Sequence, residues 1–180
     1  MNYSKPIMSM AKHSNIRLRA PEPEDVECLY EWENDEGLWH ISNSNTLLSK
    51  YDLWEYVKSG SRDIYETKQL RFMIVDNDQN AVGAIDLFDF CPKNLRAGVG
   101  ILLYAEDKRR KGLASSALKG IETYVIKHLN LHQLYANVLV ENKPSIVLFE
   151  KNGYEVCGVK KEWACSKQGW KDELLMQKIL

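Results

Sequence analysis

Three strand-like runs joined by very short turns decide most of what this chain can fold into. The runs are QLRFMIVD at 69–76, AVGAIDLFDF at 81–90 and LRAGVGILLY at 95–104, and the turns between them are NDQN and CPKN. Turns of this length connect neighbouring antiparallel strands. The runs therefore predict an antiparallel β-meander.

Helical and strand-like segments flank the meander on both sides. Apolar residues three and four positions apart predict helices at 21–35, 49–60, 112–129 and 144–153. Alternating or β-rich runs predict strands at 16–21, 133–140, 154–164 and 170–180. The order predicts an α+β fold, in which a mixed sheet carries helices on its faces.

Length and composition suit one domain that is neither a nucleic-acid wrapper nor a membrane protein. The chain has 180 residues and a net charge of -1, whereas proteins that wrap nucleic acid are usually strongly basic. No stretch approaches the roughly 20 apolar residues of a membrane-spanning helix. We expect a flexible tail at 1–14, a single domain at 15–180, and no nucleic-acid or membrane partner.

The cysteines and histidines predict neither disulfides nor a metal site. The four cysteines are widely spaced, and the four histidines do not stand beside them at zinc-ligand spacing. Free thiols indicate a reducing, cytoplasmic location.

The segment KRRKGLASSAL at 108–118 combines a cationic turn with the start of a predicted helix. A helix N-terminus offers unpaired amides and a partial positive charge, so it suits an anion. The segment matches neither the Walker nor the Gly-x-Gly-x-x-Gly pattern. A phosphate site and an ordinary basic first turn are both open on this ground alone.

Residues 109–114, RRKGLA, resemble the Arg/Gln-x-x-Gly-x-Gly/Ala signature of the GCN5-related N-acetyltransferases (GNAT family). Three further stretches resemble that family in the same order: GILLYAED before the signature, VLVENKPSIVLFEKNGYEVCG after it, and the closing GWKDELLMQKIL. The likeness covers 16–180 and is nearest to the ribosomal-protein and spermidine acetyltransferase branch.

The resemblance implies a GNAT-like, mostly antiparallel sheet of about six or seven strands, helices on both faces, and a splayed strand pair that forms an acetyl-CoA cleft. It implies acetyl-CoA-dependent transfer to a primary amine (a small amine, an amino acid or a protein N-terminus), directly within a ternary complex. The implied acetyl-CoA contacts are Leu102, Leu103, Tyr104, Arg109, Arg110, Lys111, Gly112, Leu113, Ala114, Asn142 and Ser145. Asn142 also suits the role of a helix N-cap.

The residues expected around the acceptor amine differ from those of the relatives. Phe149 stands where spermidine enzymes have a proton-donating Tyr, the strand AGVGILL lacks the Glu found in many relatives, and the loop HISNSNTLL is neutral. Asp86 is the candidate base, and Trp39, His40 and Asp86 are the candidate acceptor contacts. A non-catalytic acyl-CoA-binding module is the alternative. The acceptor, the acid, and whether the protein forms a homodimer stay open.

Overall fold

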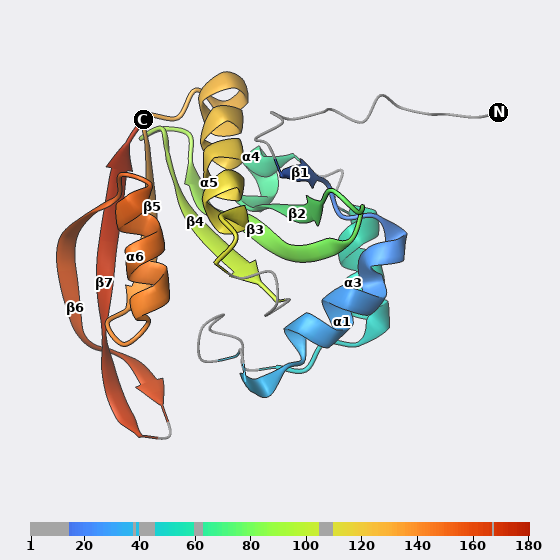
Figure 1. The fold of residues 1–180 in the computed structure, drawn as a ribbon, viewed down its shortest axis with the longest axis horizontal. Helices are drawn as coiled ribbons and strands as arrows, with labels where there is room; N and C mark the ends of the chain where they lie inside the picture. The colour runs from blue at the N-terminus through green and yellow to red at the C-terminus, as the bar shows by residue number, and fades with distance from the viewer. Residues whose placement is uncertain (1–14, 38, 40–45, 60–62, 105–109, 167) are drawn as a thin grey trace.

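A seven-stranded sheet in the order β1-β2-β3-β4-β5-β7-β6 organises the molecule (Figure 1). The computed structural model describes residues 15–37, 39, 46–59, 63–104, 110–166 and 168–180. The strands are β1 (Ile16–Arg19), β2 (Leu70–Asp76), β3 (Ala81–Cys91), β4 (Arg96–Leu103), β5 (Gln133–Leu139), β6 (Glu155–Ser166) and β7 (Gly169–Ile179). The helices are η1 (Pro23–Asp25), α1 (Val26–Glu33), α3 (Lys50–Ser59), α4 (Ile64–Thr67), α5 (Leu113–Tyr124), η3 (Val125–Leu129) and α6 (Lys143–Lys151).

The predicted meander is confirmed, since β2, β3 and β4 pair consecutively and antiparallel. Every other predicted strand is also present. The predicted helix at 112–129 differs in its last turn, because α5 passes into the π-helical turn η3 and ends at Asn130, whose φ is 50°. The short helix α4, capped by the Asp63 carboxylate, was not predicted.

Two helical layers cover opposite faces of the sheet. On one face, Leu118 and Ile121 of α5 and Phe149 of α6 share one core with Leu134 of β5 and buried residues of the other strands. On the other face, α1 and α3 form a second core, made of Val26, Leu29, Trp32, Leu53, Val57, Met73, Val75 and Ala84. Burial of these apolar side chains fixes both layers to the sheet. Within the described ranges, no helix combines the length and the apolarity that a bilayer span requires.

The parallel pair β4–β5 separates partway along its length. Only Arg96, Ala97 and Gly98 of β4 have partners in β5, and the last of these pairs is Gly98 with Tyr135. Beyond it β4 continues to Leu103, whereas β5 continues beside β7. The splayed strand pair expected from the resemblance is therefore present.

Gly98 lets two aromatic rings meet across β4. A Cβ at this position would lie 2.3 Å from the ring of Phe88 on β3. The Phe88 ring instead lies over the glycine and meets Tyr135 of β5 edge-on, with ring centroids 5.8 Å apart. The row Phe88–Gly98–Tyr135 marks the point at which the strands begin to part.

Candidate functional site

The first turn of α5 follows three exposed residues, Arg110–Gly112, and its first backbone amides have no partner within the helix. Gly112 is its N-cap, with a left-handed φ of 77° and nothing within 4 Å of the place where a Cβ would stand. Arg110, Lys111 and Gly112 are exposed, whereas the Leu113 side chain is buried in the core. Because the first amides of a helix have no partner within the helix, this turn suits an anion. The predicted contact Arg109 lies outside the described residues.

The end of β4 supplies the second part of the donor side. The half-buried Leu102 and Leu103 pair with Ala84 and Gly83 of β3. A Cβ on Gly83 would lie 2.1 Å from the Leu102 carbonyl oxygen, so this close approach requires glycine. No described residue of β5 pairs with this part of β4. At Leu102, β4 therefore runs on without β5 beside it.

Tyr104 connects the end of β4 to α1. Its amide donates to the carbonyl oxygen of Val82 at 3.1 Å, and its ring stacks on Trp32 at a centroid distance of 5.6 Å. Trp32 is buried and directly precedes Glu33 in α1. Helix α1 thus contacts the end of β4 through Trp32, and Glu33, the next residue, is the last of this helix.

Asn142 caps α6, as predicted. Its side-chain oxygen accepts a hydrogen bond from the Ser145 amide at 3.2 Å. Both residues are half-buried. They lie where β5 passes into α6, on the far side of the gap from β4.

A buried asparagine, Asn152, connects α6 to α5, and it was not predicted from the sequence. Its amide nitrogen donates to the Ser115 hydroxyl at 3.0 Å and to the Leu148 carbonyl at 2.8 Å. Ser115 belongs to the first turn of α5. The amide of Asn152 therefore fixes the turn that carries the exposed backbone amides.

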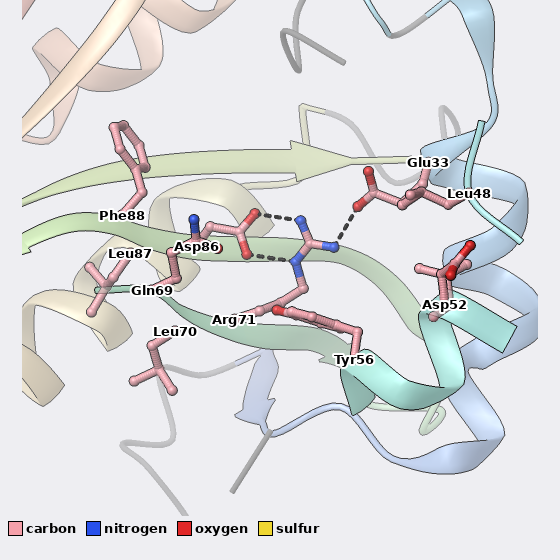
Figure 2. Close-up of a pocket in the computed structure, with 11 residues that line it drawn as sticks. Glu33, Leu48, Asp52, Tyr56, Gln69, Leu70, Arg71, Asp86, Leu87 and Phe88 are labelled. Atoms are coloured by element: carbon pink, nitrogen blue, oxygen red, sulfur yellow. Dashed lines mark hydrogen bonds and ion pairs between the residues drawn. The ribbon is translucent and has the colours of Figure 1, made fainter. Parts of the chain in front are cut away.

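A pocket of about 460 Å³ lies on the α1/α3 face of the sheet (Figure 2). Its lining residues come from α1, α3, β2 and β3 and the segment before α3: Glu33, Leu48, Asp52, Leu53, Tyr56, Gln69, Leu70, Arg71, Asp86, Leu87 and Phe88. Three carboxylates and one guanidinium give the lining a formal charge of -2, that is, 1 minus 3. Such a pocket attracts cations.

Arg71 is the electrostatic centre of this pocket. Its Nε and one terminal nitrogen donate to the two oxygens of Asp86 at 2.6 and 3.0 Å, and the other terminal nitrogen donates to Glu33 at 2.5 Å. The guanidinium also lies 5.7 Å from the ring centroid of Tyr56. Burial by itself would lower the pKa of Arg71, but the charges of Asp86 and Glu33 outweigh it and raise the pKa. Burial raises the pKa of Tyr56, and Arg71 opposes that change.

Asp86, the predicted base and substrate contact, lines the pocket. Both of its oxygens accept from Arg71, however, which makes it an ion-pair partner and leaves it poorly placed to take a proton. Asp89 has a φ of 49° at a β-bulge, and its carboxylate accepts from the Tyr135 hydroxyl at 3.0 Å. Burial, followed by this hydrogen bond, raises the pKa of Tyr135 to about 12.

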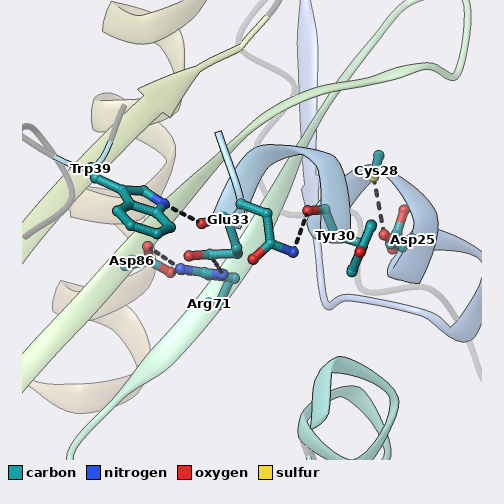
Figure 3. Close-up of polar contacts among 8 residues, drawn as sticks. Asp25, Cys28, Tyr30, Glu33, Trp39, Arg71 and Asp86 are labelled. Carbon is teal, nitrogen blue, oxygen red and sulfur yellow. Dashed lines mark hydrogen bonds and ion pairs between the residues drawn. The ribbon is translucent and has the colours of Figure 1, made fainter. Parts of the chain in front are cut away.

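Trp39, the predicted acceptor contact, lies beside the Glu33–Arg71–Asp86 group but is not one of the residues that line the pocket (Figure 3). Its indole nitrogen donates to the Glu33 carbonyl at 2.8 Å. The other predicted loop contact, His40, lies outside the described residues.

Phe149 is a core residue, 3% exposed. Its ring meets Tyr154 edge-on at 5.0 Å. Tyr154 is buried near Glu122, and burial raises the pKa of its hydroxyl. Neither side chain lines the acidic pocket.

Glu33, Tyr56 and Arg71 complete the pocket and were missed from the sequence. The available signal was Arg71 itself, the one charge in the otherwise apolar run LRFMIV at 70–75 of β2. A buried charge requires partners, and the partners lie on α1 and β3. Among the described residues, no group of three or more His, Cys, Asp or Glu side chains could hold a metal ion.

Comparison with known proteins agrees with this geometry. The model of the acetyltransferase (GNAT) domain matches residues 15–155. The SPbeta prophage-derived uncharacterized N-acetyltransferase of Bacillus subtilis is 30% identical over 140 residues, which cover 78% of this chain and 76% of the relative. The spermidine N(1)-acetyltransferase of Vibrio cholerae is 25% identical over 142 residues, 79% of this chain and 80% of the relative.

A solved structure confirms the architecture. The spermidine N-acetyltransferase of Vibrio cholerae in complex with CoA and spermine superposes with a TM-score of 0.82 at 24% identity, over 92% of this chain and 96% of that one. The chain belongs to the GNAT acetyltransferase family and is an acetyl-CoA-dependent N-acetyltransferase.

Proposed function

We propose that this protein acetylates a primary amine that binds as a cation in the acidic pocket between α1, α3, β2 and β3. The observation that carries the proposal is the pocket's charge of -2, beside the point at which β4 and β5 part. An ammonium group would be attracted there, and an acceptor bearing a carboxylate would be repelled.

On the donor side, we assign the pyrophosphate of acetyl-CoA to the first turn of α5 and its approach, residues 109–114. The open space at Gly112 and the unpaired first-turn amides support this assignment. The pantetheine arm would pair with the backbone of Leu102–Tyr104, along the edge of β4 that β5 leaves. Asn142 and Ser145 would contact it from the other side of the gap.

Two glycines separate the donor gap from the acceptor pocket. Asp86 stands opposite Gly100, and Phe88 stands opposite Gly98, so these residues share one face of the sheet. Because Gly100 carries no side chain, β4 leaves this face open beside Asp86, whereas the Phe88 ring covers the face at Gly98. A thioester in the gap would therefore face an amine in the pocket.

The arrangement favours a mechanism in which the protein speeds acetyl transfer mainly by holding the amine against the thioester. The neutral amine attacks the thioester carbonyl, so an N–C bond forms and the C–S bond breaks. The ammonium first loses one proton to solvent. CoA leaves as a thiolate, which takes up the second proton that the nitrogen loses as the amide forms. Amides of β4 would stabilise the oxyanion, and the carboxylates would orient the amine. Asp86, predicted as base, contributes charge and orientation in this scheme, because Arg71 occupies both of its oxygens.

The relatives that are spermidine N(1)-acetyltransferases support an amine acceptor. The loop HISNSNTLL is neutral, and an arginine lies inside the pocket, so neither feature favours an acceptor with several positive charges. We therefore place its acceptor among small primary amines.

An amine panel tests the proposal by the release of CoA thiol. We expect butylamine and benzylamine to be acetylated, and amino acids with a free α-carboxylate to react about tenfold more weakly. Asp52→Asn should raise the KM for the amine about three- to tenfold, with the Kd for acetyl-CoA unchanged. The exposed pair Lys50–Glu27 offers the control Glu27→Gln, which removes a carboxylate of α1 outside the pocket. Equal use of amines and amino acids would contradict the proposal.

Two broader expectations follow from the surface. The four free cysteines support the cytoplasmic location predicted from the sequence.

The exposed Trp163 and Trp170, near the tip of the β6–β7 hairpin, support a homodimer. Light scattering after gel filtration would then give twice the chain mass of 20.8 kDa.

A further inference from the structure

Within the acceptor pocket, Glu33, Asp86 and Tyr56 surround a position that suits an organic cation. Two carboxylates and one aromatic face are the groups that bind an alkylammonium or guanidinium ion in proteins. Here a side chain of the chain itself, the guanidinium of Arg71, occupies that position (Figure 2).

We infer that Arg71 is a specificity-determining residue, which fills a cation subsite of the acceptor pocket and so selects amines with one cationic group over diamines and polyamines. This inference rests on the proposed function, because it requires the pocket to hold the acceptor.

The geometry leaves that position closed to a second cation. The guanidinium lies within 3.0 Å of both Asp86 oxygens and of one Glu33 oxygen, so a second ammonium could reach these atoms only by displacing it. Arg71, Glu33 and Asp86 are only about one fifth to one third exposed. An arginine paired in this way keeps its charge at every pH that the protein tolerates.

The charge balance gives the same selectivity. The triad of Glu33, Arg71 and Asp86 carries a net charge of -1, and Asp52 supplies the only other charge of the lining. One ammonium therefore finds favourable partners, whereas a second would meet the guanidinium. Removing Arg71 changes the charge of the lining from -2 to -3 and opens the space between the two carboxylates.

The test compares butylamine with 1,4-diaminobutane on the full-length enzyme. For the natural chain we expect a higher kcat/KM with the monoamine. In Arg71→Ala, the ratio of diamine to monoamine kcat/KM should rise about tenfold, because the second ammonium takes the vacated position. Lys50→Ala is the matched control, since it removes a cation of the neighbouring helix α3 whose partner is Glu27.

A second measurement does not depend on catalysis. Arg71→Ala leaves two carboxylates without a cation, which costs stability. Methylguanidine should raise the melting temperature of Arg71→Ala and leave that of Lys50→Ala unchanged. The triple variant Glu33→Gln/Arg71→Met/Asp86→Asn removes all three charges and should show neither methylguanidine rescue nor the gain in diamine use.

The inference is overturned if Arg71→Ala keeps the natural substrate ratio, or if methylguanidine does not stabilise it. These outcomes are separate from the proposed function. If the natural chain acetylates amines and Asp52→Asn raises the KM, the acceptor pocket stands even when the role of Arg71 does not.

Discussion

At the residue scale, Gly112 combines two roles that only glycine can fill. Its φ of 77° turns the chain into α5, and the open space above it leaves room for a phosphate. Gly112→Ala should cost about 1 kcal/mol, because an L-residue is strained in the left-handed region. It should also weaken acetyl-CoA binding, measured by calorimetry. Gly158→Ala is the control, because Gly158 has the same open surroundings without a positive φ; equal effects of the two would contradict this view of Gly112.

Asn152 should affect the binding of acetyl-CoA indirectly, through the first turn of α5. Asn152→Ala deprives the Ser115 hydroxyl and the Leu148 carbonyl of a donor, which should cost about 1–2 kcal/mol in unfolding free energy. Because Ser115 lies in the first turn of α5, the KM for acetyl-CoA should rise while the KM for the amine stays constant. Asn137→Ala loses a hydrogen bond to Lys160 on the far strands and serves as control. An equal rise in the KM for acetyl-CoA and the KM for the amine would contradict this prediction, because it would indicate a general loss of structure.

Single residues were predictable where a local pattern carries the information. Asn142 was foreseen as a cap because a Pro-containing helix follows it directly. Asp86 was foreseen as a pocket residue, but its pairing with Arg71 was not, since these residues are 15 positions apart. Glu33 is 38 positions from Arg71, and no local periodicity reports such a contact.

At the scale of elements, the row Phe88–Gly98–Tyr135 couples three strands. A Cβ on Gly98 would strike the Phe88 ring, so Gly98→Ala should destabilise the protein by about 1–3 kcal/mol. Phe88→Ala removes the obstacle, and the double variant should therefore be less destabilised than the sum of the two single variants. Urea unfolding of all four proteins gives the coupling energy. If the changes in unfolding free energy of the two single variants simply add up, the Phe88 ring and Gly98 are not energetically coupled.

The elements themselves follow largely from sequence. Short turns and alternating residues predicted the meander, and spaced apolar residues predicted α1, α3, α5 and α6. The parting of β4 from β5 came from family resemblance, because it depends on which strands become neighbours. The π-turn η3 and the short helix α4 have no strong pattern of their own.

At the scale of the whole molecule, buried acidic groups predict a loss of stability at alkaline pH. Burial raises the pKa of Tyr135 from 10.0 to about 12 and that of Cys28 from 9.0 to about 11. The folded state therefore holds these protons more tightly than the unfolded state does. The stability they contribute is complete below pH 9 and is lost as pH rises towards 12.

Thermal unfolding between pH 8 and about pH 12 measures this loss. Tyr135→Phe should flatten the fall in melting temperature above pH 10, the ordinary pKa of the tyrosine. Tyr51→Phe, at an exposed tyrosine, should leave the profile unchanged. A Tyr135→Phe profile identical to that of the natural chain would contradict the prediction.

The two sides of the site differ in how far the sequence predicts them. Most of the residues proposed to bind acetyl-CoA form a contiguous signature with a strand before it, so a local pattern was enough to predict them. The acceptor side is assembled from α1, α3, β2 and β3, and only the folded sheet brings these together. The net charge of the chain is only -1, so the composition does not indicate that an acidic pocket is present.

We propose that acetyl-CoA in the β4–β5 gap and an amine in the acidic pocket meet over Gly100, opposite Asp86. A bisubstrate analogue, with the sulfur of CoA joined through a CH₂CO group to butylamine, occupies both places at once. Isothermal titration should show that it binds at least about tenfold more tightly than CoA. Asp52→Asn should reduce that gain and leave the affinity for CoA unchanged. Equal affinities of the natural chain for the analogue and for CoA would contradict the account.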